Sequence, residues 1–406
     1  MPSSARPVKL FAVLTFLVVL TISSMGCFHT DEEGSIAPLA PAAGRVDLGL
    51  GPGSRALSSG PGYKGSPSWS PGGGRIAFTV DGSVVDKPTD SGGLRRWTTR
   101  DFVARDTEWT SDDTLTMLGA APASSSRGET QSSLYRAHTG GDSLKLEKIA
   151  RGVLAISPDP DGEGLIFAFD RGAYESGLAL TRGSAEVDRI YPRPVEGRVA
   201  SLSLSPSGDE AVMAVRPEGD PETSGLRTFD LRTGEGREVT RLDGKREILG
   251  TPQWTEQGIF FVAGKQSTSV DEGGSEPLYD LYRVPADGGA PEPASGVGED
   301  FVAASISVSP DGSSLAVIGR LNTKSPTNLY VLGPATKSLE AVTANEDMEI
   351  KTGPDDLMWS PDGKSVAIVA RGTPSTEPEV RADPVDRLLR DFYNLYEIPV
   401  SGDTPR

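Results

Sequence analysis

The chain has very few of the side chains that most often carry chemistry. Among its 406 residues there are one cysteine and two histidines. A single cysteine, Cys27, excludes an intramolecular disulfide, so the fold must be stabilised by packing. His29 and His138 are too few for a zinc site built from histidine and cysteine. A Ser-His-Asp hydrolase also needs a nucleophile elbow, and the sequence contains no Gly-x-Ser-x-Gly.

Helical patterning is nearly absent as well. The 48 glycines and 32 prolines suit a chain that turns every few residues. No glycine pair follows a strand and opens a helix, so we expect no nucleotide site and no cofactor. The net charge of −17 counts against nucleic acid as a partner. The simplest interpretation of this charge is solubility, and a basic partner or a bound cation is the alternative.

The first 26 residues have the pattern of a targeting segment. Arg6 and Lys9 precede the apolar stretch Leu10–Ile22, whose 13 residues suit a signal peptide and are short for a membrane span. The stretch ends in Ser24-Met25-Gly26-Cys27, which resembles a bacterial lipobox. The resemblance implies that Cys27 is lipidated and holds the protein to the bacterial cell membrane, outside the cytoplasm. The alternative is an ordinary signal peptide with an incidental cysteine.

Residues 27–45 predict a spacer between this anchor and the folded body. The segment contains Ile36-Ala-Pro-Leu-Ala-Pro-Ala-Ala43, and sequence rich in proline and alanine favours an extended conformation. We therefore expect a signal peptide over residues 1–26, a lipid-anchored tether over 27–45 and a folded domain over 46–406.

A short phrase recurs along the folded domain. It consists of an apolar residue or tryptophan, then Ser-Pro-Asp-Gly or a variant, then an apolar β-branched run, as in Trp359-Ser-Pro-Asp-Gly-Lys-Ser-Val-Ala-Ile. The copies begin at positions 69, 109, 156, 204, 254, 308 and 359, with separations of 40, 47, 48, 50, 54 and 51 residues. A period of about 40–50 residues built on strands and turns is typical of β-propellers. The sequence predicts an all-β, seven-bladed propeller of four-stranded antiparallel blades, with six blades as the alternative.

Within each repeat, Ser-Pro-Asp-Gly is expected to be the hairpin turn between the first and second strands. A Leu-Tyr pair, such as Leu329-Tyr330, marks the third strand. The last repeat ends soon after its third strand at Leu395–Val400, while Val46–Ser59 precedes the first repeat without a blade of its own. We expect this N-terminal segment to supply the missing fourth strand and close the ring, which removes open sheet edges.

Over residues 46–406 these repeats resemble the TolB-type propeller repeat, which also occurs in propellers of prolyl oligopeptidase-like proteins and of actinobacterial surface lipoproteins. The resemblance rests on Trp-Ser-Pro-Asp-Gly followed by an Ile-Ala-Phe-like strand, as at Trp69 and Trp359. It implies the propeller architecture. TolB has six blades behind a separate N-terminal domain, whereas this chain has seven repeats without that domain. The resemblance is therefore used to predict the architecture and not the function.

Long connections between the second and third strands are expected at one end of the ring, where binding usually resides. The connections include Asp81–Leu94 at the first blade and Arg371–Tyr393 at the last. The last one contains Asp383-Pro384 and an apolar side, a pattern that predicts a two-turn helix. It either packs on its own blade or docks a partner. The candidate partner-binding residues are Arg387, Leu388, Leu389, Phe392 and Tyr393.

Two further sets of residues have mainly structural interpretations. Asp159, Asp161 and Glu163 are spaced like the start of a calcium loop, but they occupy the Ser-Pro-Asp-Gly position of their repeat, so an elaborated turn is the preferred interpretation. The tryptophans at positions 69, 109, 254 and 359 recur at one place in the repeat, which favours packing between blades over ligand binding.

These features together predict a monomeric, membrane-anchored propeller lipoprotein that acts as a protein-binding or scaffold module at the cell envelope. The membrane contact is made through the Cys27 lipid, and the expected partner is another envelope protein. No catalytic residue and no metal site are predicted. A small-ligand or glycan-binding propeller is the first alternative, and a lyase or hydrolase with acidic residues in the channel is the second.

Overall fold

The computed structural model describes Leu50 and residues 53–400, with gaps at 91, 99–101, 121–131, 139–145, 160–163, 173, 183–185, 218–223, 243–245, 266–278, 295–299, 346–347, 354–355 and 373–391. All of these residues belong to one compact unit, Ala37–Arg406. Every regular element in the described part is a strand. Residues 1–49, with the predicted signal peptide, Cys27 and the predicted tether, lie outside the described residues.

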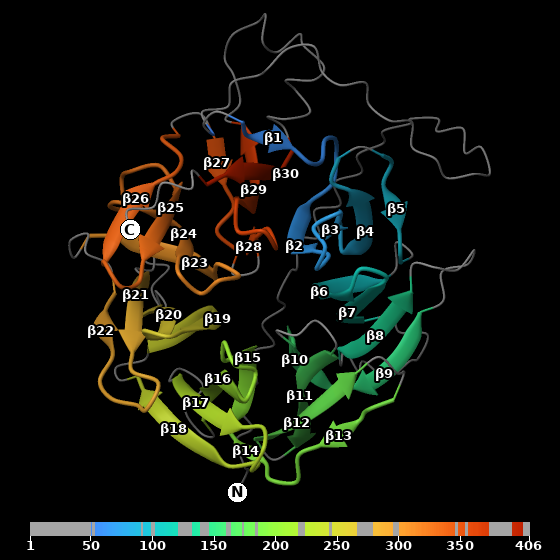
Figure 1. The fold of residues 1–406 in the computed structure, drawn as a ribbon, viewed down its shortest axis with the longest axis vertical. Coiled ribbons are helices and arrows are strands. Elements are labelled where there is room, and N and C mark those ends of the chain that lie inside the picture. Colours follow the sequence, from blue (N-terminus) through green and yellow to red (C-terminus); the bar gives the residue numbers. More distant parts are fainter. Residues whose placement is uncertain are drawn as a thin grey trace, which may run out of the picture. The chain divides into compact units, whose positions relative to one another are not determined.

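The strands form seven antiparallel sheets that follow one another around a ring (Figure 1). Blade one contains β2 (Lys64–Trp69), β3 (Arg75–Val80), β4 (Ser83–Pro88) and β5 (Arg95–Arg96). Blade two contains β6 (Val103–Ser111), β7 (Thr114–Ala120), β8 (Ser133–His138) and β9 (Glu147–Arg151). Blade three contains β10 (Val153–Pro158), β11 (Gly164–Gly172), β12 (Glu175–Arg182) and a split outer strand, β13 (Arg189–Ile190) and β14 (Val195–Glu196).

The remaining blades have the same plan. Blade four contains β15 (Arg198–Leu204), β16 (Glu210–Arg216), β17 (Gly225–Asp230) and β18 (Gly236–Arg241). Blade five contains β19 (Arg246–Thr255), β20 (Gly258–Lys265), β21 (Tyr279–Val284) and β22 (Glu292–Pro293). Blade six contains β23 (Val302–Val308), β24 (Leu315–Arg320), β25 (Asn328–Gly333) and β26 (Ser338–Ala341). Blade seven contains β27 (Met348–Ile350), β28 (Leu357–Trp359), β29 (Ser365–Gly372), β30 (Asn394–Pro399) and β1 (Arg55–Ala56).

The seven-bladed prediction is confirmed, and so is the closure of the ring. β1 pairs with β30 in antiparallel register, with Arg55 opposite Glu397 and Ala56 opposite Tyr396. The N-terminal segment therefore supplies the outermost strand of the last blade. The innermost strand of each blade contacts that of the next, and β28 contacts β2, so the inner ring is complete.

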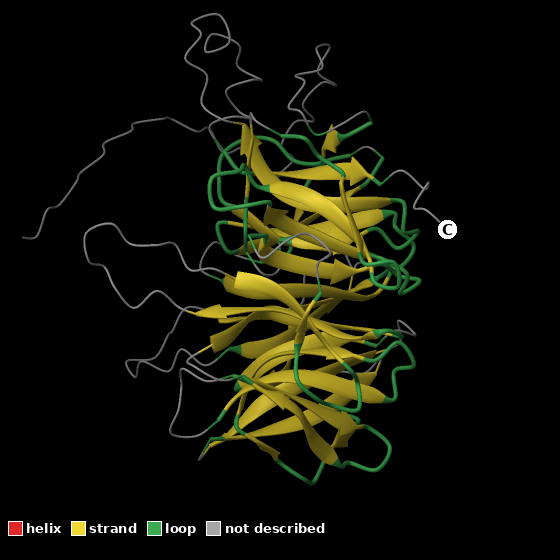
Figure 2. Ribbon diagram, turned by 90° about the vertical axis from the view of Figure 1, so that its left-hand side faces the viewer, coloured by secondary structure: helices red, strands yellow, loops and turns green. Residues whose placement is uncertain are grey.

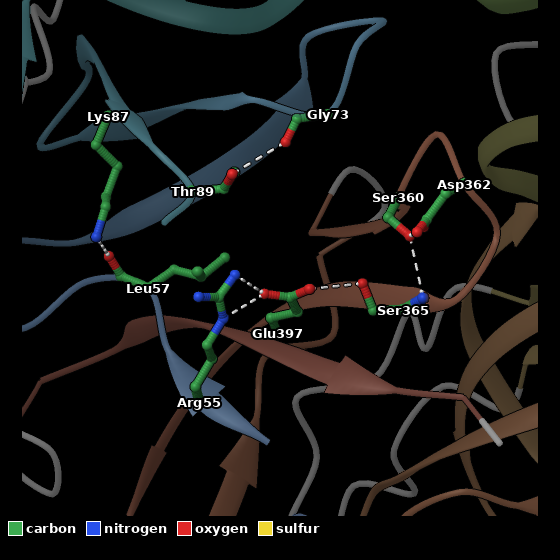
Figure 3. A network of polar contacts seen from close by, with 9 residues as sticks. All are labelled: Arg55, Leu57, Gly73, Lys87, Thr89, Ser360, Asp362, Ser365 and Glu397. Atoms are coloured by element: carbon green, nitrogen blue, oxygen red, sulfur yellow. Dashed lines mark hydrogen bonds and ion pairs between the residues drawn. The ribbon is translucent and has the colours of Figure 1, made fainter. Parts of the chain in front are cut away.

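Residues of blade seven and of blade one hold the closing segment in place (Figure 3). Glu397 accepts hydrogen bonds from Arg55 Nε at 2.6 Å and from Ser365 Oγ at 2.8 Å. Lys87 of blade one donates its Nζ to the Leu57 carbonyl at 3.0 Å. The Leu57 side chain is buried in the apolar cluster between blades seven and one. The short strand β1 thus acts as a clasp fixed on both sides.

The Ser-Pro-Asp-Gly phrase forms the turn between strands one and two, as predicted. In blade six, Gly312 N donates to Ser309 O at 2.8 Å, and Gly312 has a φ of 71°, which favours glycine. Ser309 Oγ donates to Asp311 Oδ1 at 2.6 Å and accepts from Ser314 N at 3.0 Å. The bond from Ser309 is the main reason that the pKa of Asp311 is lowered. Ser360 makes the same contacts in blade seven, so these aspartates hold turns.

The apolar core is divided into clusters that lie between neighbouring blades. Trp69 packs with Val369 of blade seven, and Trp359 packs with Ile318 of blade six. Trp109 and Trp254 likewise pack against the blade that precedes their own. The tryptophans that open the repeats are therefore buried between blades, as the sequence indicated.

One predicted connection is wrong. Asp81–Leu94 is not a long loop between strands two and three, because β4 occupies Ser83–Pro88 within it. The actual connection is the two-residue turn Asp81-Gly82, whose φ values of 50° and 78° are both positive. An Asp-Gly pair is typical of the tight type I′ hairpin, whose twist matches that of the flanking strands. Blade one therefore has no long loop at this place.

Candidate functional site

The up-and-down order of strands places two kinds of connection at the same end of the ring. These are the connections from strand two to strand three and the links from one blade to the next. We call this the loop-bearing end. The side view shows the sheets stacked with their connections at two opposite ends (Figure 2). In blades two, four, five, six and seven, the strand ends that flank the connection from strand two to strand three lie at this end. Long segments join these strand pairs, which are β7–β8, β16–β17, β20–β21, β24–β25 and β29–β30.

Exposed apolar side chains are concentrated at the loop-bearing end. Among the described residues, five large apolar side chains are 48–60% exposed: Tyr63, Val103, Tyr174, Ile190 and Leu321. Tyr63 lies in the link to β2 and Val103 begins β6, while Tyr174 lies in the β11–β12 turn and Leu321 directly follows β24. Only Ile190 lies elsewhere, on the outer strand β13. Four of these five side chains therefore belong to one end of the ring.

Where the ring closes, this end carries a cluster of aromatic and charged side chains. Tyr393 Oη donates to Glu349, which also accepts from Arg371 Nε at 2.8 Å. The Arg371 guanidinium lies 4.8 Å from the centre of the Tyr393 ring. Tyr63 meets Tyr393 edge to face at 5.9 Å, and the Lys351 ammonium lies 4.1 Å from the Tyr63 ring. We call these five residues the closure cluster.

The closure cluster has perturbed acidity. The hydrogen bond from Tyr393 and the adjacent Arg371 lower the pKa of Glu349. Burial, followed by the bond to Glu349, raises the pKa of Tyr393 to about 12. Both groups therefore keep their usual charge at neutral pH, a carboxylate and a neutral phenol. The arrangement therefore fixes the orientation of the Tyr393 ring.

A buried lysine lies next to this cluster. Lys64 begins β2, is 2% exposed, and donates its Nζ to the carbonyls of Gly60 and Pro61. Burial lowers its pKa to about 8, and nearby Asp81 opposes that shift. Lys64 thus fixes the link between the closing strand β1 and blade one.

A cavity of about 350 Å³ opens at the loop-bearing end between blades three and four. Its lining includes Tyr174, three glutamates and two arginines, and the glutamates are Glu175, Glu196 and Glu238. Arg227 lies 3.4 Å from Glu196, and Arg241 lies 3.0 Å from Glu238. Sequence reasoning did not anticipate this cavity, because its lining comes from five strands and three connections in two blades.

The structure describes only two of the predicted partner-binding residues. Phe392 and Tyr393 are half-buried next to β30, and Tyr393 belongs to the closure cluster. Arg387, Leu388 and Leu389, with most of the predicted helix, lie outside the described residues. Their role in binding remains a prediction.

The other candidate sites take structural roles where they are described. Asp159 lies in the β10–β11 turn with Arg182 at 3.7 Å, while Asp161 and Glu163 lie outside the described residues. Within the described ranges no group of three histidine, cysteine or acidic side chains is placed to hold a metal. His138 ends β8 at the end opposite the loop-bearing one, with its Nδ1 3.0 Å from Thr114 Oγ1. None of the described segments contains a helix suited to crossing a membrane.

No family model and no curated protein matches the chain. Among solved structures, oligogalacturonate lyase from Vibrio parahaemolyticus aligns with a TM-score of 0.52 and 10% identity, over 86% of this chain and 94% of that one. The β-propeller domain of the Trilobed protease from Pyrococcus furiosus aligns with a TM-score of 0.51 and 12% identity, over 76% and 91% of the two chains. The shared feature is the fold, a β-propeller.

A protein assigned as TolB from Agrobacterium tumefaciens aligns with a TM-score of 0.44 and 13% identity, over 78% of this chain and 92% of that one. The Trilobed protease propeller is described as having an open velcro topology. This chain differs, because β1 pairs with β30 and completes blade seven.

Proposed function

We propose that the protein is a membrane-anchored propeller lipoprotein outside the cytoplasm that binds another envelope protein through its loop-bearing end. The apolar leader and Cys27 support the anchor. The observation that carries the binding proposal is the location of Tyr63, Val103, Tyr174 and Leu321 at one end of the ring. Large exposed apolar side chains on a rigid scaffold are typical of protein interaction surfaces.

We propose binding without catalysis. The imidazole of His138 lies at the opposite end of the ring and bonds Thr114, so it supplies no base near the candidate surface. In the closure cluster, Glu349 is held by Tyr393 and Arg371, which favours its charged, hydrogen-bonded form over proton transfer. The chemistry of this end is suited to recognition.

Site-specific crosslinking in intact cells tests the binding proposal. A photoreactive phenylalanine placed at position 63 or 321 should capture the same protein, because both positions lie at the loop-bearing end. The matched control is position 190, which is equally exposed but lies on an outer strand. Equal capture from position 190, or none from 63 and 321, contradicts the proposal.

A further inference from the structure

The cavity between blades three and four has an unbalanced charge. Glu175 of β12 lies directly opposite Glu196 of β14 in antiparallel register. Like charges in this position repel one another and destabilise the pair. Glu196 is partly compensated by Arg227 at 3.4 Å, whereas Glu175 has no ion-pair partner among the described residues. With Glu238 paired to Arg241, the cavity keeps a net negative charge centred on Glu175.

Tyr174 borders the same cavity in an unusual backbone conformation. Its φ of 59° lies in the left-handed region, which glycine and asparagine adopt far more readily than a bulky residue. Tyr174 is nevertheless exposed, and both it and Glu175 are lining residues of the cavity. A tyrosine ring next to an uncompensated carboxylate can hold a cation through its face while the carboxylate accepts its hydrogen bonds.

We propose that this cavity receives the side chain of an arginine or lysine presented by a partner polypeptide. The inference rests on the proposed function, since it assigns the chemistry of one contact on the loop-bearing end. The volume of about 350 Å³ is near the lower limit of ligand cavities, roughly 300–1,000 Å³, and suits a single side chain.

The test uses the full mature protein and two tripeptides, acetyl-Gly-Arg-Gly-amide and its citrulline counterpart, with binding followed by calorimetry. Citrulline has the shape of arginine without the charge. We expect the arginine peptide to bind about tenfold or more tightly than the citrulline peptide, and to bind less tightly as salt increases. Equal binding of the two peptides, or no binding of the arginine peptide at millimolar concentration, overturns the proposal.

Two variants connect this binding to the cavity. Glu175→Gln should weaken the arginine peptide about tenfold, whereas Glu340→Gln, an exposed glutamate of β26, should leave it unchanged. Tyr174→Asn should weaken it about two- to fivefold without lowering the melting temperature, because asparagine suits the left-handed conformation. A Glu175→Gln variant that binds as well as the wild type overturns the assignment.

The outcome is separable from that of the crosslinking experiment. If capture from positions 63 and 321 persists while the arginine peptide fails to bind, only the cavity assignment is wrong. Preferential binding of acetyl-Gly-Glu-Gly-amide also overturns it, because Arg227 and Arg241 would then form an anion site. If the arginine peptide binds and no protein is captured, the partner proposal is the one contradicted.

Discussion

Arg55 and Glu397 lie 342 positions apart in the sequence, yet Arg55 Nε donates to Glu397 Oε2 at 2.6 Å. The pair joins the first strand of the fold to the last one. It is also partly exposed, with the Arg55 side chain 47% accessible. The ion pair therefore adds little to the stability of the closure, since exposed pairs contribute about 0–1 kcal/mol to the free energy of unfolding. It reflects the register in which β1 pairs with β30.

Truncating the apolar side chain of Leu57, next to β1, should lower the free energy of unfolding more than truncating the charged side chain of Arg55 in β1. Leu57→Ala should lower the free energy of unfolding by about 2–5 kcal/mol, because Leu57 is buried between blades seven and one. Arg55→Ala should lower it by at most about 1 kcal/mol. Urea denaturation measures both. A deletion of residues 46–59 should be far more damaging than one of 28–44, and equal effects would contradict the clasp.

Asp86 should be the most sensitive polar residue of blade one. Its side chain is fully buried and accepts from Trp97 Nε1 at 2.8 Å and from Arg95 Nε at 3.2 Å, and it also pairs with Arg75. Asp86→Ala should lower the free energy of unfolding by about 3 kcal/mol, because the Trp97 indole and the guanidinium groups of Arg75 and Arg95 lose their acceptor. Thermal and urea unfolding measure the loss. A change as small as that of the exposed control Glu340→Gln would show that the network is dispensable.

Cys27→Ser tests the membrane anchor. If the thiol is lipidated, the variant should leave the membrane fraction or remain unprocessed, because two acyl chains provide most of the attachment. Cell fractionation and gel mobility measure the change. Identical behaviour of the wild type and the variant would contradict lipidation.

Lys64 should make stability depend on alkaline pH. Its pKa is about 8 in the folded chain against 10.5 as the usual value, so the unfolded chain binds more protons between these values. The free energy of unfolding therefore gains a contribution as pH rises from about 8 to 10.5. In urea titrations, the free energy of unfolding of the wild type minus that of Lys64→Met should increase over this interval, because the variant lacks the titrating group. A constant difference would mean that Lys64 is as solvated as it is in the unfolded state.

Leu388 tests the predicted helix of the last connection. Leu388→Asp should abolish partner capture from position 63 while the melting temperature stays nearly unchanged, because the prediction places this side chain at a partner. Differential scanning fluorimetry and crosslinking measure the two effects. If the same change unfolds the last blade, the side chain packs in the core and binding must reside elsewhere on the loop-bearing end.

Sequence reasoning succeeded where one local signal defines one local structure. In blades one, four, six and seven the Ser-Pro-Asp-Gly phrase or its variant closes a turn through bonds within six residues, as Ser309, Asp311 and Ser314 show. Its recurrence along the sequence therefore marked the blades. The closing strand was also predictable, because the last repeat lacked a strand and the N-terminus offered one. The Asp81-Gly82 turn carries an equally local signal, an Asp-Gly pair, but the prediction of one long loop over Asp81–Leu94 left no room for β4.

The candidate sites could not be found in this way. The closure cluster joins Tyr63 to Glu349 and Tyr393, which lie 286 and 330 positions away in the sequence. The cavity joins Tyr174 to Glu238 across two blades. Such groupings depend on which side chains face each other between sheets, and no spacing within one repeat records that. Sequence indicated the end of the ring but not the residues that meet there.

The pairing of β1 with β30 also determines when the ring can close as the chain is synthesised. During synthesis β1 emerges first among the strands and must wait for β30, so the ring stays open until nearly the whole chain has been made. Throughout that interval two unpaired sheet edges are accessible to other chains. A premature stop after blade six would make this state permanent, and its product should be cleared by chaperones and proteases instead of accumulating as folded protein.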